Sequence, residues 1–215
     1  MSTLDNQIAY WNTTGASKTF SHPVNFAWLD SLLNSQAHIL DYGCGYGRTM
    51  HLLYEHGYHN LEGVDSAPGM LARARQSCPD LTFTQIGSLP LPHSDASFDA
   101  ALLFAVLTCI PGDATQQALV RELFRVLKPG GLLYISDLLL QTDERNLARY
   151  HAFQERYGRY GVFETGDGAV CRHHDKDWLH SLVADFEPVH TDEIEVMTMN
   201  QHPVKAFQLL IRKPT

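Results

Sequence analysis

Three glycines within five residues follow a short apolar segment and constrain the fold more than any other feature of the chain. Ile39-Leu40-Asp41-Tyr42 has the character of a buried strand, and Gly43-Cys44-Gly45-Tyr46-Gly47 follows it directly. Residues 48–56 then have a helical pattern that stops at Gly57. Glycines at such a turn allow positive φ angles and let the backbone approach a ligand closely. The turn therefore predicts a parallel sheet with a ligand site beyond its first strand.

Strand-like and helix-like segments continue to alternate up to about residue 140, which indicates a parallel sheet with crossover helices. Further strands are expected at residues 61–64, 81–86, 98–104 and 132–140, and further helices at residues 68–77 and 114–127. Lys128-Pro129-Gly130-Gly131 is expected to end the last of these helices.

The remaining segments suggest additions around this core. Residues 144–160 and 175–184 have helical patterns, 161–168 are expected to form a loop, and 187–199 and 204–212 to form an antiparallel pair. Residues 4–33 are expected to form one or two helices across the mouth of the sheet. We therefore predict a single domain. Its parts are an arm or lid at 1–36, a cofactor-binding core at 37–140, a substrate-lid insert at 141–175, and a C-terminal helix and strand pair at 176–215.

Composition disfavours several classes of protein. The net charge of −8 argues against nucleic acid and anionic lipid as partners. No apolar run approaches the roughly 18 residues of a membrane span, and the N-terminus has no signal-peptide pattern. The four cysteines form no C-x-x-C pair, so we expect no zinc or other metal site and reduced thiols in the cytoplasm.

An acidic residue near the end of the second strand narrows the ligand to one that contains a nucleoside. Asp65 follows Gly43 by 22 residues, a position from which a carboxylate can accept both hydroxyl groups of a ribose. An Asp65→Ala variant is expected to lose nucleoside binding and to keep its thermal midpoint. Arg48 stands where a dinucleotide fingerprint needs Gly or Ala, and Asp41 would repel a pyrophosphate. Asp41 suits an ammonium or sulfonium group, and S-adenosylmethionine carries both.

Four segments resemble the motifs of the class I S-adenosylmethionine-dependent methyltransferases, in particular small-molecule enzymes of the methyltransferase type 11/25 kind. They are ILDYGCGYGR (39–48), LEGVDSAPGML (61–71), LPLPHSDASFDA (89–100) and VRELFRVLKPGGLLYISD (120–137). The resemblance implies an α/β fold, a doubly wound, Rossmann-like three-layer sandwich. Its seven-stranded, mostly parallel sheet would have a C-terminal antiparallel strand, with an N-terminal helical arm and a helical insert after strand five.

The same resemblance assigns roles around the cofactor. Asp41 would hold the methionine amino group, Asp65 the ribose hydroxyls, and Gln85 the adenine amino group in place of the family's usual Asp. The other positions that the resemblance places at the cofactor are Gly43, Cys44, Gly45, Ser66, Met70, Ile86 and Phe104. Cys44 is expected there for its small size.

Methyl transfer from a sulfonium needs alignment and exclusion of water more than an acid or base, so the motifs leave any catalytic residue open. His151 is our candidate general base. The candidate substrate pocket comprises Tyr10, Trp11, Lys18, Phe20, His22, Tyr150, His151, Tyr157, Arg172 and His173. Tyr150 and Tyr157 lie at helical spacing, which is also typical of packing. The arm aromatics could equally be anchors, and Lys18 a surface residue. His173 and His174 would point to opposite faces of a strand, which disfavours a metal.

The sequence therefore predicts an enzyme that moves a methyl group from S-adenosylmethionine to a small molecule by in-line displacement, releasing S-adenosylhomocysteine. It is expected to act as a monomer or homodimer. Two alternatives stay open: a non-catalytic S-adenosylmethionine-binding protein of the same fold, and a nicotinamide-dependent oxidoreductase, which Arg48 disfavours.

Overall fold

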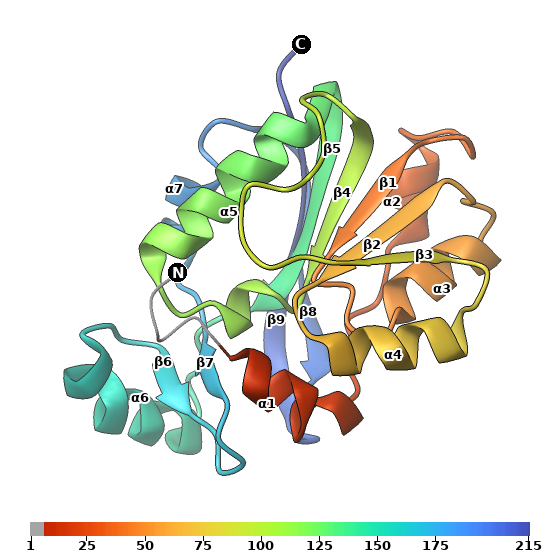
Figure 1. Cartoon of the computed structure of the whole chain (residues 1–215). Coiled ribbons are helices and arrows are strands. Elements are labelled where there is room, and N and C mark those ends of the chain that lie inside the picture. Colours follow the sequence, from red (N-terminus) through yellow and green to blue (C-terminus); the bar gives the residue numbers. More distant parts are fainter. Residues whose placement is uncertain (1–6) are drawn as a thin grey trace.

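A seven-stranded sheet forms the centre of the molecule (Figure 1). The computed structural model describes residues 7–215. The strands follow the spatial order β3-β2-β1-β4-β5-β9-β8. In chain order they are β1 (Ile39–Tyr42), β2 (Leu61–Asp65), β3 (Thr82–Gln85), β4 (Phe98–Phe104), β5 (Leu127–Leu138), β8 (Glu187–Met197) and β9 (Pro203–Arg212).

The pairing of the strands fixes where a ligand can bind. Strands β1 to β5 pair in parallel, and β9 pairs antiparallel with both β5 and β8. The order along the sheet reverses at β1, which lies between β2 and β4. A crevice opens beyond the carboxyl ends of the strands at such a reversal. The predicted ligand turn lies at this point.

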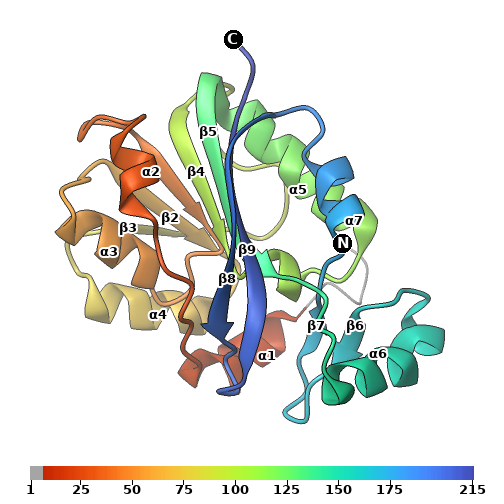
Figure 2. The same ribbon diagram turned by 180° about the vertical axis from the view of Figure 1, so that it is seen from behind.

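Helices cover both faces of the sheet (Figures 1 and 2). One face packs against α2 (Phe26–Asp30), α3 (Arg48–Glu55) and α4 (Pro68–Ser77), and the other against α5 (Asp113–Val126) and α7 (Lys176–Leu182). Successive strand residues alternate between the two cores, as period-two side chains must. Leu102, for example, faces the α3 side and Leu103 the α5 side. The predicted three-layer, doubly wound fold class is confirmed.

Helix α5 ends at Val126, close to the predicted end. Strand β5 already begins at Leu127, which pairs with Phe98 before the register shifts. The Lys128-Pro129-Gly130-Gly131 segment is therefore an irregular part of the strand and not a turn that precedes it. Gly130 has a φ of +76° there, which a glycine adopts without strain.

The insert after β5 differs from the prediction. Helix α6 (Glu144–Tyr157) forms as expected, but the predicted loop at 161–168 is wrong, because β6 (Val162–Glu164) and β7 (Val170–Arg172) make an antiparallel hairpin. Thr165 closes its turn by hydrogen bonds to Asp167 and Ala169. The segment therefore contains a tight turn flanked by two strands of three residues each, which are too short to give a clear alternating pattern.

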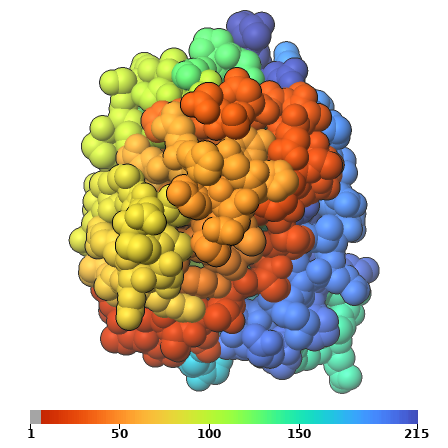
Figure 3. All heavy atoms as spheres, turned by 90° about the vertical axis from the view of Figure 1, so that its right-hand side faces the viewer, coloured from red at the N-terminus to blue at the C-terminus, as the bar shows by residue number. Residues whose placement is uncertain are grey.

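The N-terminal arm divides into two parts. Helix α1 (Ile8–Asn12) and the 3₁₀ turn η1 (Gly15–Ser17) lie at the carboxyl ends of the strands, as expected for the mouth of the sheet. The 3₁₀ turn η2 (Leu107–Cys109), which follows β4, lies there as well. Helix α2 lies away from the mouth, with Leu29 in the core beside α3. Figure 3 shows the arm running beside α3, α4 and the C-terminal strands. Residues 1–6 of the predicted arm lie outside the described residues. No helix in residues 7–215 has the length and apolar character that a membrane crossing requires.

Candidate functional site

The glycine turn connects β1 to α3 through three residues with positive φ. Gly43, Gly45 and Gly47 have φ angles of +70°, +54° and +81°. The N–H groups of Gly43 and Cys44 both donate to the Val64 carbonyl, at 2.8 and 3.1 Å. A Cβ atom at Gly43 would lie 2.5 Å from a methyl carbon of Val106. The turn thus combines left-handed backbone with close packing, and only glycine satisfies both at Gly43.

Asp65 ties the end of β2 to this turn. Its Oδ2 accepts the N–H of Gly45 at 2.9 Å, and its Oδ1 accepts the N–H of Ala67 at 2.8 Å. Burial raises the pKa of Asp65, and the backbone hydrogen bonds oppose that shift. A carboxylate has about four lone-pair sites. Both oxygens therefore keep acceptor capacity for hydroxyl groups.

Asp41 is buried at the end of β1 with one oxygen lacking a partner. Its Oδ2 has no hydrogen-bond donor among the described residues. Desolvation raises the pKa of Asp41 to about 7, although the charge of Arg48 opposes the shift. An unpaired buried carboxylate is costly. A cationic group on a ligand would relieve that cost.

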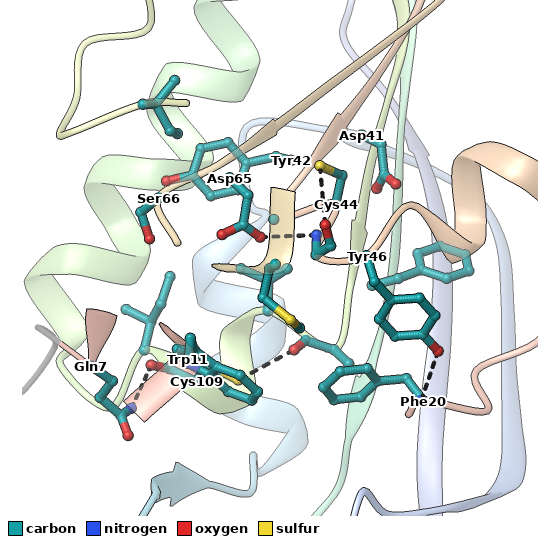
Figure 4. A pocket seen from close by; sticks show the side chains of 18 of the residues that line it. Gln7, Trp11, Phe20, Asp41, Tyr42, Cys44, Tyr46, Asp65, Ser66 and Cys109 are labelled. Atoms are coloured by element: carbon teal, nitrogen blue, oxygen red, sulfur yellow. Dashed lines mark hydrogen bonds between the residues drawn. The ribbon is translucent and has the colours of Figure 1, made fainter. Parts of the chain in front are cut away.

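A first cavity opens beside the turn, with about 1,120 Å³ of empty space that is partly open to solvent. Figure 4 shows Asp41, Asp65 and Ser66 on one side and Trp11 and Phe20 on the other. The predicted residues that line it are Trp11, Phe20, Asp41, Gly43, Cys44, Gly45, Asp65, Ser66, Met70, Ile86 and Phe104. Residues that the sequence analysis did not assign to the cofactor or substrate also line it: Gln7, Ile8, Tyr42, Tyr46, Arg48, Thr49, Gly87, Ser88, Ala105, Val106, Cys109 and Ile110.

Gln85 is the one predicted cofactor residue that does not line this cavity. It is exposed at the end of β3, and its side-chain amide donates to the carbonyl of Ser66 at 3.4 Å. Its neighbour Ile86 lines the cavity and donates its N–H to the carbonyl of Asp65.

The N-terminal arm is fastened over the first cavity. Phe20 donates its N–H to the Tyr46 hydroxyl at 3.2 Å, and its ring stacks on that of Tyr46. Arg73 of α4 lies 3.9 Å from the centre of the Tyr46 ring and donates to the carbonyls of Ala16 and Lys18. These contacts hold Phe20 at the wall of the cavity.

A second set of contacts joins the arm to the β6–β7 hairpin. The ammonium of Lys18 lies 2.5 Å from Asp167 and 2.6 Å from the side-chain oxygen of Asn200. Tyr10 donates its hydroxyl proton to Asp167 at 3.2 Å. We call these contacts of Tyr10 and Lys18 with Asp167 the clip. Tyr10 and Lys18 were predicted as pocket residues, but they lie in the clip and line neither cavity.

A second cavity adjoins the first and contains about 590 Å³ of empty space, partly open to solvent. Phe20, Ala105 and Cys109 line both cavities and so form the boundary between them. The second cavity is otherwise lined by His22, Thr108, Leu138, Arg145, Arg149, Phe163, Thr165, Cys171, His173, Met197, Thr198, Met199, Asn200 and His202.

Of the predicted pocket histidines, His22 and His173 line the second cavity, and both are neutral. Burial lowers the pKa of His22 to about 3, and its Nδ1 lies 2.9 Å from the Ser136 hydroxyl. Burial, together with the charge of Arg149, lowers the pKa of His173 well below its usual value. Neither ring therefore carries a charge at neutral pH.

Besides Tyr10 and Lys18, four further predicted pocket residues lie outside both cavities. Tyr150 is buried behind His173, Tyr157 bonds to Glu164, and Arg172 pairs with Asp113 at 2.7 Å. His151 is exposed on α6, edge-on to Tyr160. A general base must reach the acceptor, and His151 lines neither cavity, so the hypothesis that it is a general base stays a prediction without support from its position.

The adjacent histidines are both buried after β7 and have different neighbours, with His173 against Tyr150 and Phe163. His174 contacts the Gln116 amide and the Leu138 carbonyl. Among residues 7–215, no group of three or more His, Cys, Asp or Glu could hold a metal ion.

The second cavity also holds two arginines that sequence reasoning missed. Arg145 and Arg149 lie four residues apart on α6, a spacing that places side chains on one face of a helix. This four-residue spacing is the sequence signal that indicates that both arginines lie on one face of the helix.

Comparison with known proteins gives the family. The family described as "Methyltransferase domain" matches residues 39–131, from β1 into β5. A trans-aconitate 2-methyltransferase of Azoarcus sp. is 38% identical over 153 residues, covering 71% of this chain and 57% of that protein. The human methyltransferase-like protein 27 is 31% identical, covering 65% of this chain and 55% of that protein. The chain thus spans a little over half the length of these two relatives.

A solved structure extends the likeness to most of the fold. An S-adenosylmethionine-dependent methyltransferase from Methanosarcina mazei superimposes with a TM-score of 0.83 at 23% identity, covering 90% of this chain and 99% of that one. This family and fold imply S-adenosylmethionine as the cofactor and S-adenosylhomocysteine as its product. The chain carries a methyltransferase domain and belongs to the class I S-adenosylmethionine-dependent methyltransferase family.

Proposed function

We propose that the protein transfers a methyl group from S-adenosylmethionine in the first cavity to a small molecule in the second. The observation that carries this proposal is the shared boundary: Phe20, Ala105 and Cys109 line both cavities. An in-line displacement needs donor and acceptor on either side of a common plane, at contact distance and without intervening water. Two adjoining cavities with a partly aromatic boundary fit that requirement.

The first cavity fits the cofactor by the chemistry of its donors and acceptors. The unpaired oxygen of Asp41 suits the ammonium of the methionine part, and the remaining lone pairs of Asp65 suit the ribose hydroxyls. Met70 and Ile86 offer apolar contacts for the adenine, beside Ser66. The roles given by the family resemblance are thus compatible with the arrangement of these side chains. Gln85 is the exception, since its amide contacts Ser66.

The sulfonium of the cofactor supplies the methyl group, and the protein's part is to orient the acceptor and keep water out. We assign this part to the arm, residues 1–36, and the insert, residues 141–175, around the core at 37–140. Trp11 and Phe20 reach the first cavity from the arm, and Arg149, Phe163 and His173 reach the second from the insert. No further recognition domain is needed to hold a small acceptor.

Cofactor binding and turnover are tested separately. Trp11 lines the first cavity, so its fluorescence should report on a titration with S-adenosylhomocysteine. We expect binding to the wild-type protein, little binding to Asp65→Ala, and no comparable binding of NADH. A Trp11→Phe variant should still bind, as followed by calorimetry, but with a smaller fluorescence change. Tighter binding of NADH would refute the assignment.

Turnover is tested with methyl-labelled S-adenosylmethionine and a pooled extract of small metabolites. We expect label in one or a few acceptors, formed together with S-adenosylhomocysteine. Binding of the cofactor with no label in any acceptor would support the alternative, a non-catalytic S-adenosylmethionine-binding protein.

A further inference from the structure

We propose that the second cavity binds an acceptor that carries a carboxylate, and that Arg149 is the residue that recognises this group. The inference rests on the proposed function, since it names the class of acceptor for the same site. It depends on three features of the second cavity: the positive charge of its lining, the lack of an acidic partner for Arg149, and the hydrogen-bond donors near Arg149.

The second cavity is positively charged in a protein of net charge −8. Arg145 and Arg149 line it, and its described lining includes no Asp or Glu. The first cavity has the opposite character, with Asp41 and Asp65 in its wall. The two cavities therefore select for opposite charges, which keeps a cationic cofactor and an anionic acceptor in separate places.

Arg149 is half-buried and lacks an acidic partner. Its guanidinium carbon lies 3.6 Å from the centre of the Phe163 ring, so the ring supports the guanidinium. Its Nε is buried without a hydrogen-bond partner, and no ion pair joins Arg149 to a carboxylate within residues 7–215. Arg145, in contrast, is exposed and lies near Asp143, whose pKa its charge helps to lower. Of the two arginines, Arg149 is the one that needs an anion.

The shape of a guanidinium favours a planar anion. Its Nε and Nη protons form a fork that matches the two oxygens of a carboxylate, and a Lys at the same place would act only as a point charge. A buried Nε without a partner is costly until such a ligand supplies an acceptor. The stacked position on Phe163 fixes the plane in which that acceptor must lie.

His173 adds a donor to the same cavity. The Tyr150 hydroxyl accepts the N–H of Gln141 at 3.1 Å and lies 2.5 Å from Nδ1 of His173. We assign the tyrosine proton to this contact with Nδ1 as its acceptor, which places the proton of the neutral ring on Nε2. Thr108, which also lines the cavity, has a buried hydroxyl oxygen without a partner in the described chain. Nε2 of His173 and the Thr108 hydroxyl are thus available as hydrogen-bond donors.

The rest of the wall indicates the body of the acceptor. Phe20, Leu138, Phe163, Met197 and Met199 supply apolar and polarisable surface. Methionines adapt to ligands of different shape. The wall therefore suits a flat or apolar carboxylic acid, held by its carboxylate at Arg149.

The test compares carboxylates with their neutral amides on the complex with S-adenosylhomocysteine. The probes are benzoate and benzamide, trans-cinnamate and cinnamamide, and succinate and succinamide, with phenyl phosphate as the other anion. Binding is measured by calorimetry on the full chain. We expect at least one carboxylate to bind about tenfold or more tightly than its amide, the size of one charge-assisted pair.

Variants assign that preference to Arg149. Arg149→Gln should remove the preference, Arg149→Lys should keep part of it, and Arg121→Gln, an exposed arginine on α5, should leave it unchanged. Unchanged affinity of Arg149→Gln for S-adenosylhomocysteine shows that the variant is folded.

The outcomes separate the two proposals. Failure to bind S-adenosylhomocysteine refutes the proposed function. Normal binding of S-adenosylhomocysteine without any preference for a carboxylate over its amide overturns the present inference alone. So does a preference that survives in Arg149→Gln, or tighter binding of phenyl phosphate than of every carboxylate.

Discussion

The backbone N–H of Gly45 donates to the Asp65 carboxylate over 2.9 Å, so the residue predicted to hold the ribose also holds the glycine turn. The second oxygen of Asp65 accepts the N–H of Ala67. The side chain therefore stabilises the site before any ligand arrives. This double role changes what an Asp65 variant is expected to do.

Replacing Asp65 with Ala should destabilise the ligand-free protein as well as weaken binding. The change leaves the N–H groups of Gly45 and Ala67 without acceptors, whereas the sequence alone predicted an unchanged midpoint. Because burial raises the pKa of Asp65, desolvation offsets part of the loss, and we expect about 1 kcal/mol. Urea unfolding without ligand measures it, with the exposed Asp80→Ala as control. Equal stability of Asp65→Ala and wild type would contradict the structural role.

Binding of S-adenosylhomocysteine should become tighter as the pH rises. The pKa of Asp41 is raised to about 7 by desolvation, and only the ionised form pairs with an ammonium. Between pH 6 and pH 8 the ionised fraction, and with it the affinity, should rise about tenfold. Asp41→Asn should bind weakly with a flat pH profile. The same pH slope in Asp41→Asn would exclude Asp41 as its source.

The contribution of the buried carboxyl groups to the stability of the ligand-free protein should change with pH in the opposite direction. The folded-state pKa values of Asp41 and Asp137 lie near 7, above the usual value of 3.8, because both groups are desolvated. The stabilisation from their protonated forms is complete below about pH 4 and is lost as the pH rises through 7. The contribution of these two carboxyl groups to the free energy of unfolding should therefore fall between pH 5 and pH 8, whereas the buried neutral His22 and His173 contribute a rise with pH that is complete near pH 6.5. Asp41→Asn should reduce this fall, as urea unfolding at each pH would show, and an identical fall in the variant would contradict it.

Local sequence signals sufficed for the core of the fold and for the first cavity. The glycine turn, Asp41 and Asp65 lie within or next to strands whose apolar patterns are unmistakable, and parallel pairing brings their ends to one edge. Nine of the ten residues that the family resemblance assigned to the cofactor line the first cavity. Gln85 departs from the family pattern, and it is the predicted cofactor residue whose side chain lies elsewhere.

The second cavity could not be predicted in the same way, because its walls come from segments far apart in the sequence. The arm, η2, α6, the β6–β7 hairpin and the end of β8 all contribute to it. Tyr150 and Arg149 are neighbours on α6, yet one is core and the other faces the cavity. Only the packing of α6 on the β6–β7 hairpin determines which of these two side chains is buried in the core and which one lines the cavity. The pairing of Lys18 with Asp167 is equally invisible to local patterns.

Gly43→Ala should destabilise the protein far more than a matched glycine variant. At Gly43 the φ is +70° and an added Cβ would lie 2.5 Å from Val106, whereas Gly158 has a φ of +65° and no atom within 4 Å. Gly158→Ala thus measures the backbone strain alone, about 1 kcal/mol. We expect Gly43→Ala to cost roughly 1–3 kcal/mol more, by overpacking against Val106. Adding Val106→Ala should recover most of this difference in urea unfolding. Equal losses for the two single variants would show that the contact with Val106 is unimportant.

Breaking the clip between Lys18 and Asp167 should loosen the arm. Burial raises the pKa of Asp167, but the hydrogen bonds from Lys18, Thr165 and Tyr10, together with the charge of Lys18, outweigh burial and lower the pKa to about 2. The clip is therefore sensitive to salt and not to pH near neutrality. Asp167→Asn should raise the dissociation constant of S-adenosylhomocysteine about twofold to fivefold, as for a partly exposed ion pair. Hydrogen exchange in α1 should rise with it.

A charge swap distinguishes this clip from a general effect of surface charge. The double variant Lys18→Asp with Asp167→Lys should restore part of the affinity and of the protection in α1. Glu193→Gln, which removes the exposed partner of Lys176, should change neither, because that pair lies between α7 and β8. If Asp167→Asn binds S-adenosylhomocysteine as tightly as wild type at low salt, the arm is held closed by its contacts with Tyr46 and Arg73 alone. In that case the hairpin does not control access to the first cavity.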